Sequence, residues 1–444
     1  MEKLFEKEAV SKVYFKLALP VVLSMIVSMV YSLADTYFVA KTGNANLVAG
    51  VTIGAPLFSF MLAVGDIFGL GGSAIVSQLF GQKNYALSKR LASASFYATI
   101  VISLVLTVIL LIFEKPILLL LGAKPATYQY AADFYRVLVA GSTFITVSLV
   151  PGNLIRTEGL AVQSMVATMA GTILAIILDP LFLFVFNWGA AGVALANVLG
   201  YALNTSLLIY CVKTKSRYLS FNLKLAKLSW ADWKRVIEIG IPASITNFMQ
   251  TFGMALLNNY LAPFGAASVA AMGITQKIYG IVILVLVGFA FGAQPLVGYC
   301  YGAKNVQRFK EVLRFDIMVE VVYALVFSVI LMILAPGLVS CFMNQAEIVK
   351  EGAYMLRACL ATTPFIGLIM VLTTVFQSAS KAMSALLMSV SRQGVFYLLV
   401  MLAFSSLFGY HGIIWAQAVA DILTAVMGIY LYRKSFKNFN WPTS

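Results

Sequence analysis

The stretch Gly71–Asn84 reads G-G-S-A-I-V-S-Q-L-F-G-Q-K-N, and the stretch Gly292–Asn305 reads G-A-Q-P-L-V-G-Y-C-Y-G-A-K-N. Both begin with a glycine, keep a second glycine in one register and close on Lys-Asn. Pro20 and Pro242 extend the match upstream, with a shift of one residue. A unit of about half the chain is therefore repeated, which excludes a solenoid of short repeats.

The composition places this repeated chain in a bilayer. Of its residues, 61% are hydrophobic and 11% are charged, whereas ordinary soluble domains carry roughly 25% charged residues. We predict an all-α membrane protein of twelve transmembrane helices, in two pseudo-symmetric six-helix bundles, an N-lobe and a C-lobe, around a central cleft. The predicted spans are residues 17–40, 47–78, 91–113, 131–152, 159–186, 189–211, 239–261, 269–299, 315–339, 353–378, 384–408 and 410–432.

The lysines and arginines predict the orientation of the chain. The net charge is +14, and most of the 31 Lys and Arg residues fall in the termini and in the segments that share a side with them. By the positive-inside rule, both termini are cytoplasmic in a multi-pass protein of the cell membrane. We predict an N-lobe of residues 1–212, a basic cytoplasmic linker of residues 213–238 and a C-lobe of residues 239–444. The charge indicates orientation rather than a nucleic-acid partner, and we expect a monomer in the lipid bilayer.

Polar faces distinguish three spans of the N-lobe. Residues three or four apart share a helix face. At such spacings stand Ser24, Ser28, Tyr31, Ser32 and Asp35 in the first span, Thr168, Thr172, Ala175 and Asp179 in the fifth, and Asn197, Tyr201 and Asn204 in the sixth. Ionisable residues at bilayer depth are costly and indicate function by default. Burial favours the neutral form of a carboxyl group, and a neighbouring carboxylate favours it further. We therefore predict a proton or sodium site formed by Asp35, Asp179, Asn197 and Tyr31; in the alternative, an Asp caps a broken helix or pairs with a basic residue.

The second half lacks acids at the matching depth. Leu257 stands at the register of Asp35, and the first span of this half instead carries neutral amides. Amides can hydrogen-bond a ligand but cannot exchange a proton, so we expect the two halves to have different roles; the alternative is that the amides hold helices together. Methionines suit apolar cations, although packing is their commoner role. The predicted substrate cavity comprises Met25, Ser28, Met29, Asn247, Gln250, Met254, Gln276 and Lys277.

Other charged residues in the spans are expected to have structural roles. Asp66 lies among glycines, which suggest close helix packing and a backbone partner. Asp316, Glu320 and Asp421 lie nearer the span ends, where local pairing is expected. His411 is the only histidine, so neither an HExxH metal site nor a Ser-His-Asp triad can be assembled in the core. We predict no enzyme activity, no cofactor and no certain metal site, and without a Walker motif the energy source is an ion gradient.

Longer motifs stand at several points along the chain, most of them in its first half. They are D-T-Y-F-V-A-K-T-G from Asp35, R-T-E-G from Arg156, L-D-P ending at Pro180, G-A-A-G from Gly189, and Q-P-L-V-G-Y-C-Y-G-A-K-N from Gln294. With these motifs and the duplication, the chain resembles the MATE family (multidrug and toxic compound extrusion), in its DinF/MepA-like branch. The resemblance runs from about Lys16 to Lys434.

This resemblance implies a cation site in the N-lobe with Asp35 and Asp179 as its two acids. Asn197 falls where members often have Thr, and Ala175 falls where many have Asn. The resemblance therefore implies fewer oxygen ligands than sodium requires, which favours protons. Gln250 stands where the NorM-type branch has a glutamate.

The predicted function is export of amphipathic, mostly cationic small molecules by antiport and alternating access. Protons are the expected coupling ion, and sodium is the alternative. Pro20 is the predicted hinge, because it removes one helical hydrogen bond and lets the first helix bend when the acids change charge. The alternative function is a flippase or exporter of a lipid-linked or other endogenous metabolite. That function requires several basic residues in the cavity, and only Lys277 is a candidate.

Overall fold

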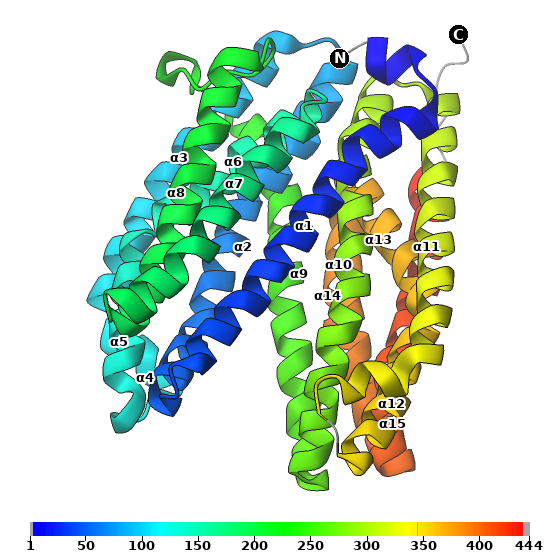
Figure 1. Ribbon diagram of the computed structural model, residues 1–444. Helices are drawn as coiled ribbons and strands as arrows, with labels where there is room; N and C mark the ends of the chain where they lie inside the picture. Colours follow the sequence, from blue (N-terminus) through cyan, green and yellow to red (C-terminus); the bar gives the residue numbers. More distant parts are fainter. Residues whose placement is uncertain (1–2, 344, 438–444) are drawn as a thin grey trace. The chain divides into compact units, whose positions relative to one another are not determined.

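Helices form nearly all of the backbone in the computed structural model of this chain (Figure 1). The structure describes residues 3–343 and 345–437. No strand occurs within these ranges, which confirms the predicted all-α class.

Two helical series follow one another along the chain. The first consists of α1 (Val10–Lys41), α2 (Ala45–Gly81), α3 (Tyr85–Ile112), α4 (Glu114–Leu120), α5 (Pro125–Ala140), α6 (Ser142–Thr157), α7 (Ala161–Pro180) and α8 (Gly189–Lys215). The second consists of α9 (Trp230–Leu261), α10 (Ala266–Gly302), α11 (Val306–Ser340), α12 (Ala346–Ala361), α13 (Thr363–Ser378), α14 (Ala382–Val390) and α15 (Phe396–Phe436). The short π- or 3-10-helical segments are η1 (Lys3–Lys7), η2 (Leu181–Val185), η3 (Leu223–Leu225), η4 (Ala262–Phe264) and η5 (Ser391–Val395).

The helices pack into two compact units. The first unit contains Leu23–Ser244, and the second contains Phe5–Val22 together with the chain from Ile245 onward. Helices α1 and α9 therefore each contribute to both units. In each of the two helices the change of unit comes just after the proline, Pro20 in α1 and Pro242 in α9.

The helices account for all twelve predicted spans. Eight segments of the described chain are long and apolar enough to cross a membrane, and the bent pairs α5–α6 (47°) and α12–α13 (45°) bring the number to ten. The eleventh span is α9, whose first turns carry charged residues. The twelfth follows from α15, in which Gly409 interrupts the helix at φ 55° between the two predicted spans. A glycine is suited to this positive φ because it has no Cβ.

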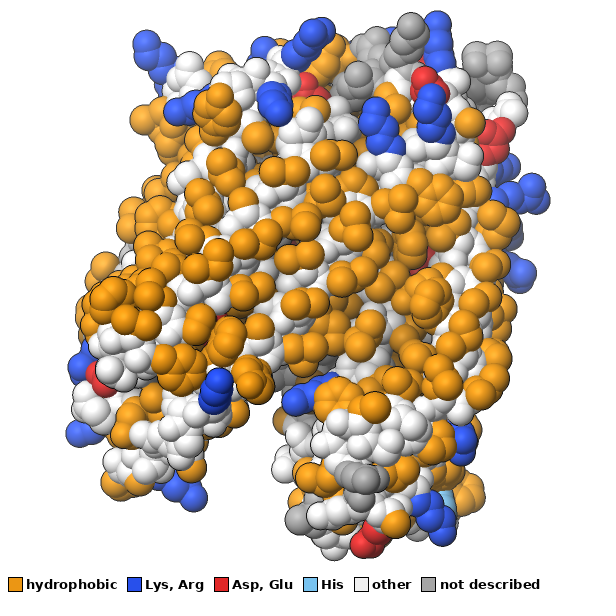
Figure 2. Space-filling model, in the orientation of Figure 1, with side chains coloured by type: hydrophobic (Ala, Val, Ile, Leu, Met, Phe, Trp, Pro, Cys, Tyr) orange, Lys and Arg blue, Asp and Glu red, His pale blue; other side chains and the backbone are white. Residues whose placement is uncertain are grey.

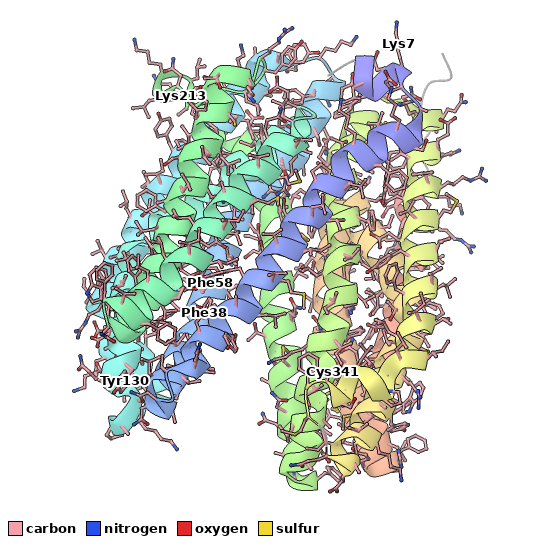
Figure 3. All side chains as sticks on the ribbon, in the orientation of Figure 1. Lys7, Phe38, Phe58, Tyr130, Lys213 and Cys341 are labelled. Atoms are coloured by element: carbon pink, nitrogen blue, oxygen red, sulfur yellow. The ribbon has the colours of Figure 1, made fainter. Side chains whose placement is uncertain are left out.

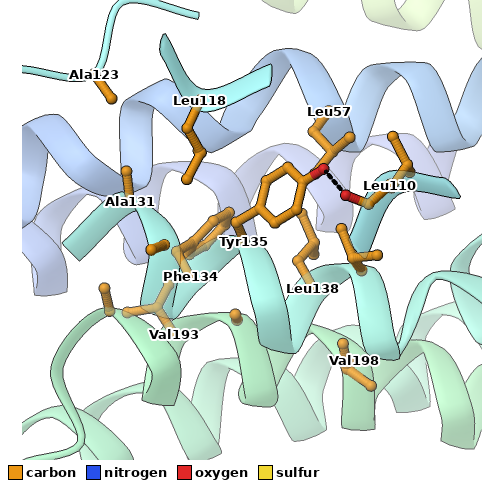
Figure 4. Close-up of a cluster of buried hydrophobic side chains, with 14 of the residues drawn as sticks. Leu57, Leu110, Leu118, Ala123, Ala131, Phe134, Tyr135, Leu138, Val193 and Val198 are labelled. Atoms are coloured by element: carbon orange, nitrogen blue, oxygen red, sulfur yellow. Dashed lines mark hydrogen bonds between the residues drawn. The ribbon is translucent and has the colours of Figure 1, made fainter. Parts of the chain in front are cut away.

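The core of the first unit lies between α2, α5 and α8. Leu57, Phe134 and Val193 are among its buried side chains. Tyr135 is fully buried in the same cluster, and its hydroxyl donates a hydrogen bond of 2.7 Å to the carbonyl oxygen of Leu110 (Figure 4). Because an unpaired buried hydroxyl is costly, this bond permits a tyrosine at an apolar position. The cluster fixes α5 between α2 and α8, the helices that form much of the cavity wall described below.

Two equivalent helix crossings reproduce the sequence repeat. In the first unit, a Cβ on Gly71 of α2 would overlap the backbone of Val236 and Gly240 in α9. In the second unit, a Cβ on Gly292 of α10 would overlap the backbone of Ala18 in α1. Gly71 and Gly292 are counterparts in the repeat, so the duplicated motif marks the place where the first helix of each repeat crosses a second helix closely.

The linker between the repeats is attached to the first unit. The Glu158 side chain accepts hydrogen bonds from the Ser216 hydroxyl and from the backbone N–H of Arg217. Ser93 and Arg90 of α3 donate to the carbonyl oxygens of Ser220 and Lys227. Part of the predicted basic linker is therefore held along α3.

The surface fits a protein surrounded by lipid. Hydrophobic side chains cover most of the face shown in Figure 2, and lysines and arginines gather toward the ends of the units. Within the first unit, Lys213 lies at one end, Tyr130 lies at the other and Phe58 lies between them (Figure 3). An apolar band between charged ends is what a bilayer requires.

Candidate functional site

The polar faces of α1, α7 and α8 converge on one cavity inside the first unit. Its volume is about 400 Å³. The polar residues that line it are Ser28, Tyr31, Ser32 and Asp35 from α1, Thr168 and Thr172 from α7, and Asn197, Tyr201 and Asn204 from α8. All of them belong to the faces that residue spacing singled out, because positions three or four apart project to one side of a helix.

The rest of the cavity wall is apolar. Ala175 and Gly171 of α7 face it between the polar residues. The remaining side chains come from α2 and α5: Val51, Ala55, Phe58, Leu62, Phe134 and Leu138. Sequence reasoning missed this wall, because apolar residues at helical spacing in a membrane span look alike whether they face lipid, a core or a ligand. The combination of an apolar wall with a few polar groups is typical of small-molecule sites.

Two carboxyl groups lie together at this cavity. Asp35 lines it, and Asp179 is fully buried beside Asp35. The two carboxyl groups lie close enough to interact electrostatically with each other, and the Tyr31 phenol lies close enough to interact with both. Both oxygens of Asp179, Oδ1 of Asp35 and the Tyr31 hydroxyl are buried without a hydrogen bond of ordinary geometry to any described residue. Buried polar groups are normally satisfied, so this cluster has spare capacity for a proton or a cation.

The amides beside the carboxyl groups differ in how they are held. The Asn197 side chain donates to the carbonyl oxygen of Val193 at 3.3 Å, which leaves its oxygen for the cavity. Oδ1 of Asn204 is buried without a partner among the described residues. Ala175 lines the cavity with a methyl group, where the resemblance expected an oxygen ligand in many relatives. Asn204 was not among the predicted site residues, but it lines the cavity as Asn197 does and also offers a side-chain oxygen.

Not every predicted cavity residue faces this cavity. Ser28 does, whereas Met25 and Met29 of α1 are half-buried and do not line it. The hinge candidate Pro20 lies inside α1, in the part of that helix that belongs to the second unit.

The predicted residues of the second half are dispersed. Met254 and Gln276 line a small pocket of about 20 Å³ in the second unit, with Leu257 also in its wall. Gln250 and Lys277 are exposed. Asn247 is half-buried.

Asp66 and Asp421 have structural roles, as expected. Gly65, next to Asp66 in the sequence, packs so closely on α6 that a Cβ would overlap the Thr146 carbonyl oxygen. The guanidinium of Arg156 interacts electrostatically with Asp66. Asp66 thus has a basic neighbour in addition to close helix packing. Asp421 of α15 is fully buried and forms an ion pair of 3.0 Å with Arg392 of η5.

The expectation for Asp316 and Glu320 was wrong. Both are fully buried on α11, and neither forms an ion pair with a described residue. The second half therefore does contain buried acids, on its third span rather than at the register of Asp35. Their place near the end of a predicted span suggested local pairing, but the folded chain covers this part of α11 with the Tyr14 side chain.

Among the described residues, no group of three or more His, Cys, Asp or Glu side chains could hold a metal ion. Asp35, Asp179 and the neighbouring hydroxyl and amide groups are hard oxygen ligands, suited to protons or to cations such as sodium rather than to transition metals.

Two repeats of six spans, with carboxyl groups buried at a cavity within one of them, define a multi-pass membrane protein built like the secondary transporters. The MatE family model matches the chain twice, over residues 20–181 and 242–425. The chain belongs to this family, MATE, and the double match confirms the internal duplication.

Relatives and solved structures agree with this assignment. The chain is 26% identical over 428 residues to the multidrug export protein MepA of Staphylococcus haemolyticus, covering 96% of this chain and 94% of that protein. It is 27% identical over 433 residues to MepA of Staphylococcus aureus, covering 97% and 95%. The crystal structure of MATE in complex with MaL6 superposes with a TM-score of 0.93 at 22% identity, over 98% of both chains. That likeness confirms the fold, with two six-helix bundles.

Proposed function

We propose that this chain exports amphipathic, mostly cationic small molecules in exchange for protons that move inward. The observation that carries the proposal is the cavity of the first unit, where Asp35 and the buried Asp179 meet without hydrogen bonds that satisfy them. The family assignment and the likeness to proteins named MepA multidrug export protein support an efflux role.

Asp35 and Asp179 would carry the protons. Two neighbouring carboxylates in a water-poor interior repel each other, and each is costly without a counter-ion. Uptake of a proton removes both costs, whereas a bound organic cation or a sodium ion would offset them by charge. Proton and cation therefore compete for the same acids, which is the physical basis of exchange. Tyr31 and Asn197 would hold the carboxyl groups in place by hydrogen bonds.

Alternating access would follow from the bending of α1. Asp35 lies near one end of this helix and Pro20 lies near the other, so a change of charge at Asp35 acts on a helix that already lacks one backbone hydrogen bond. We place the protein in the cell membrane as a monomer, with both termini in the cytoplasm, because of the distribution of lysines and arginines.

The drug would be bound by apolar and polar neutral groups as well as by the acids. Phe58 and Phe134 line the cavity of the first unit, and aromatic rings can attract organic cations. Asn247, Gln250 and Gln276 supply amides in the second half, with Met254 beside Gln276. Amides of this kind adjust substrate choice without taking part in proton exchange.

A flippase for lipid-linked precursors receives less support. A pyrophosphate group needs several cationic side chains, and no lysine or arginine is among the described residues that line the cavity of the first unit. Lys277 is an exposed residue of the second unit.

The decisive experiment uses purified full-length protein in sealed liposomes with a pH-sensitive dye. Addition of a lipophilic cation such as ethidium should release protons across the membrane in proportion to drug movement, with and without sodium. The Asp35→Asn/Asp179→Asn variant serves as the matched control, because it keeps the shape of both side chains. Drug movement without proton movement would overturn the proposal.

A further inference from the structure

A second pair of acids lies in the second unit, and the proposed export function does not use it. Asp316 and Glu320 stand one turn apart on α11, and both side chains are fully buried. We refer to them as the acid pair. The Tyr14 hydroxyl donates a hydrogen bond of 2.8 Å to Oδ1 of Asp316. Oδ2 of Asp316 and both oxygens of Glu320 have no hydrogen bond of ordinary geometry to a described residue, although the backbone N–H of Ala290 lies near Glu320.

An aromatic cluster surrounds the acid pair. The ring centroid of Tyr14 lies 5.1 Å from that of Phe315 and 6.3 Å from that of Phe289 on α10. Phe289 in turn lies 5.8 Å from Tyr323. On the α13 side, Gly367 allows the helix to lie directly against the backbone of Glu320. Such a pocket offers little water to solvate a charge.

No described cation compensates the acid pair. The two carboxyl groups of the acid pair interact electrostatically with each other. The other titratable groups that interact with them are the phenols of Tyr14 and Tyr323. Helix α13 carries no titratable residue. Arg357 of α12 reaches α11 at the Met332 carbonyl oxygen, twelve residues or about 18 Å beyond Glu320 along the helix. Lys12 and Lys16, on either side of Tyr14 in α1, and Arg314, two residues before Asp316 in α11, are exposed.

The two carboxyl groups cannot both be ionised in this setting. Two like charges on one helix face, sealed from water and without a cation, would each carry a large desolvation cost. One negative charge on Asp316 can be accommodated by the Tyr14 hydroxyl. A second charge on Glu320 would meet only the backbone N–H of Ala290, which makes no hydrogen bond of ordinary geometry with the carboxylate, so a bound proton is expected there.

One wall of the pocket is a segment with an unusual position in the chain. Tyr14 belongs to Phe5–Val22, the part of α1 that packs in the second unit, whereas the same helix continues to Asp35 in the first. Val22 and Ala18 contact α10 so closely that Gly288 and Gly292 must be glycines. The start of this segment is held by the Tyr299 hydroxyl, which donates to Glu6, and by Arg308, which donates to the Glu8 carbonyl oxygen. Water that enters to solvate a second charge would therefore have to separate the part of the segment around Tyr14 from α10 and α11.

We propose that Asp316 and Glu320 form a second proton-binding site, distinct from Asp35 and Asp179, and that loss of its last proton releases Phe5–Val22 from α10 and α11. The site is a latch on the N-terminal part of α1, closed while a proton is bound and opened by alkalinisation. It acts on the helix that carries Asp35 and contains Pro20.

Thiol labelling of the full-length protein in lipid nanodiscs tests this latch. The parent has Cys211, Cys300, Cys341 and Cys359 replaced by alanine. Val13→Cys reports on Phe5–Val22, because Val13 is fully buried. Ser11→Cys is the matched control, since Ser11 is exposed on the same turn and measures how thiol reactivity itself rises with pH. The ratio of the two labelling rates should rise with pH by about tenfold, equivalent to about 1.4 kcal/mol.

The rise should be absent in the Asp316→Asn/Glu320→Gln background, because the amides keep the shape and have no proton to lose. It should persist in the Asp35→Asn/Asp179→Asn background. A flat ratio in the parent would overturn the proposal, and so would a rise that survives in the first background or vanishes in the second. The labelling needs neither drug nor gradient, so its outcome does not depend on whether the protein exports drugs.

Infrared spectroscopy gives a second measurement should the double amide variant fold poorly. At neutral pH the Asp35→Asn/Asp179→Asn protein should retain the carbonyl band of a protonated, water-excluded carboxylic acid. The single change Glu320→Gln, added to that background, should remove the band. If the band is missing before this change, or is untouched by it, the acid pair does not hold the proton.

Discussion

Gly292 on α10 lies against Ala18 on α1 with no room for a methyl group between them, and Gly71 on α2 lies in the same way against Gly240 on α9. The two contacts are related by the sequence repeat and occur in different units. Each brings the first helix of one repeat onto a helix of the other repeat. The glycines of the duplicated motif are thus explained by backbone approach rather than by a phosphate-binding loop.

Gly292→Ala should therefore destabilise the protein, and Gly273→Ala should not. Both glycines lie within α10, but Gly273 has nothing within 4 Å of the position of a Cβ. Overpacking at Gly292 should cost about 1–3 kcal/mol, whereas a helical Gly→Ala change in open space should be neutral or stabilise by up to about 1 kcal/mol. Thermal unfolding of the two variants in detergent measures the difference. Equal melting temperatures would contradict the contact.

Asp35→Asn should abolish transport while leaving folding and insertion intact. The amide keeps the shape of the side chain in the cavity wall but cannot release a proton. Cells expressing the variant should be as drug-sensitive as cells without the protein. Glu347→Gln is the control, because it removes an exposed acid in the first turn of α12 and should leave resistance unchanged. Full resistance with Asp35→Asn would remove Asp35 from the mechanism.

Drug uptake into inverted vesicles should follow the pH gradient and ignore sodium at fixed pH. The reason is Ala175, which presents a methyl group to the cavity and thins the oxygen shell that sodium needs. Ala175→Asn should then introduce a measurable sodium dependence. Strict dependence on sodium in the unmodified protein would show instead that Asn204 or water completes the shell.

The two halves should respond differently to substitution. Gln250→Ala should change which drugs are exported, by loss of hydrogen bonds worth about 1 kcal/mol each, and should keep the pH dependence of transport. Asp179→Asn should stop pH-driven turnover of every drug while drug binding persists. A panel of drugs crossed with external pH separates these effects. The division of roles would be reversed if Gln250→Ala moved the pH profile and Asp179→Asn changed only the drug spectrum.

Arg392→Met should destabilise the second unit strongly. Asp421 accepts hydrogen bonds from Arg392 at 3.0 Å and from Gln417 at 2.9 Å, and it is fully buried. Removal of one partner of a buried ion pair costs about 3–5 kcal/mol. The double variant Arg392→Met/Asp421→Leu should regain most of the lost stability, because no buried charge is left unpaired. Arg314→Met, which alters an exposed arginine, is the control for the loss of a charge.

The features that could be predicted from the sequence are those that repeat or show periodic polarity. The duplication around Gly71 and Gly292 predicted two bundles, and apolar run lengths predicted all twelve spans. Polar residues at helical spacing predicted that Tyr31, Asp35 and Asn197 share one cavity, because a polar stripe in a membrane helix has to face protein or water.

The features that could not be predicted depend on which helices meet. Phe58 and Phe134 carry no signal in the sequence that distinguishes a cavity wall from a lipid-facing surface. Asp316 and Glu320 were expected to pair locally, because hydropathy along α11 gives no information about a tyrosine from a distant part of the chain. Tyr14 is more than 300 residues away from them in sequence, and local spacing cannot show so distant a contact.

The division of α1 between the units has a consequence for how the chain is made. Phe5–Val22 is synthesised before most of the first unit, whereas α10 and α11, the helices it packs on, are synthesised after that unit. Until α10 and α11 have been synthesised, this segment lacks the helices that bury the ring of Tyr14 in the folded protein. The reverse holds for the start of α9, which finds α2 already in place. Assembly is thus completed by an early segment closing onto late ones, and a protein truncated after the linker would lack the partners of its own first helix.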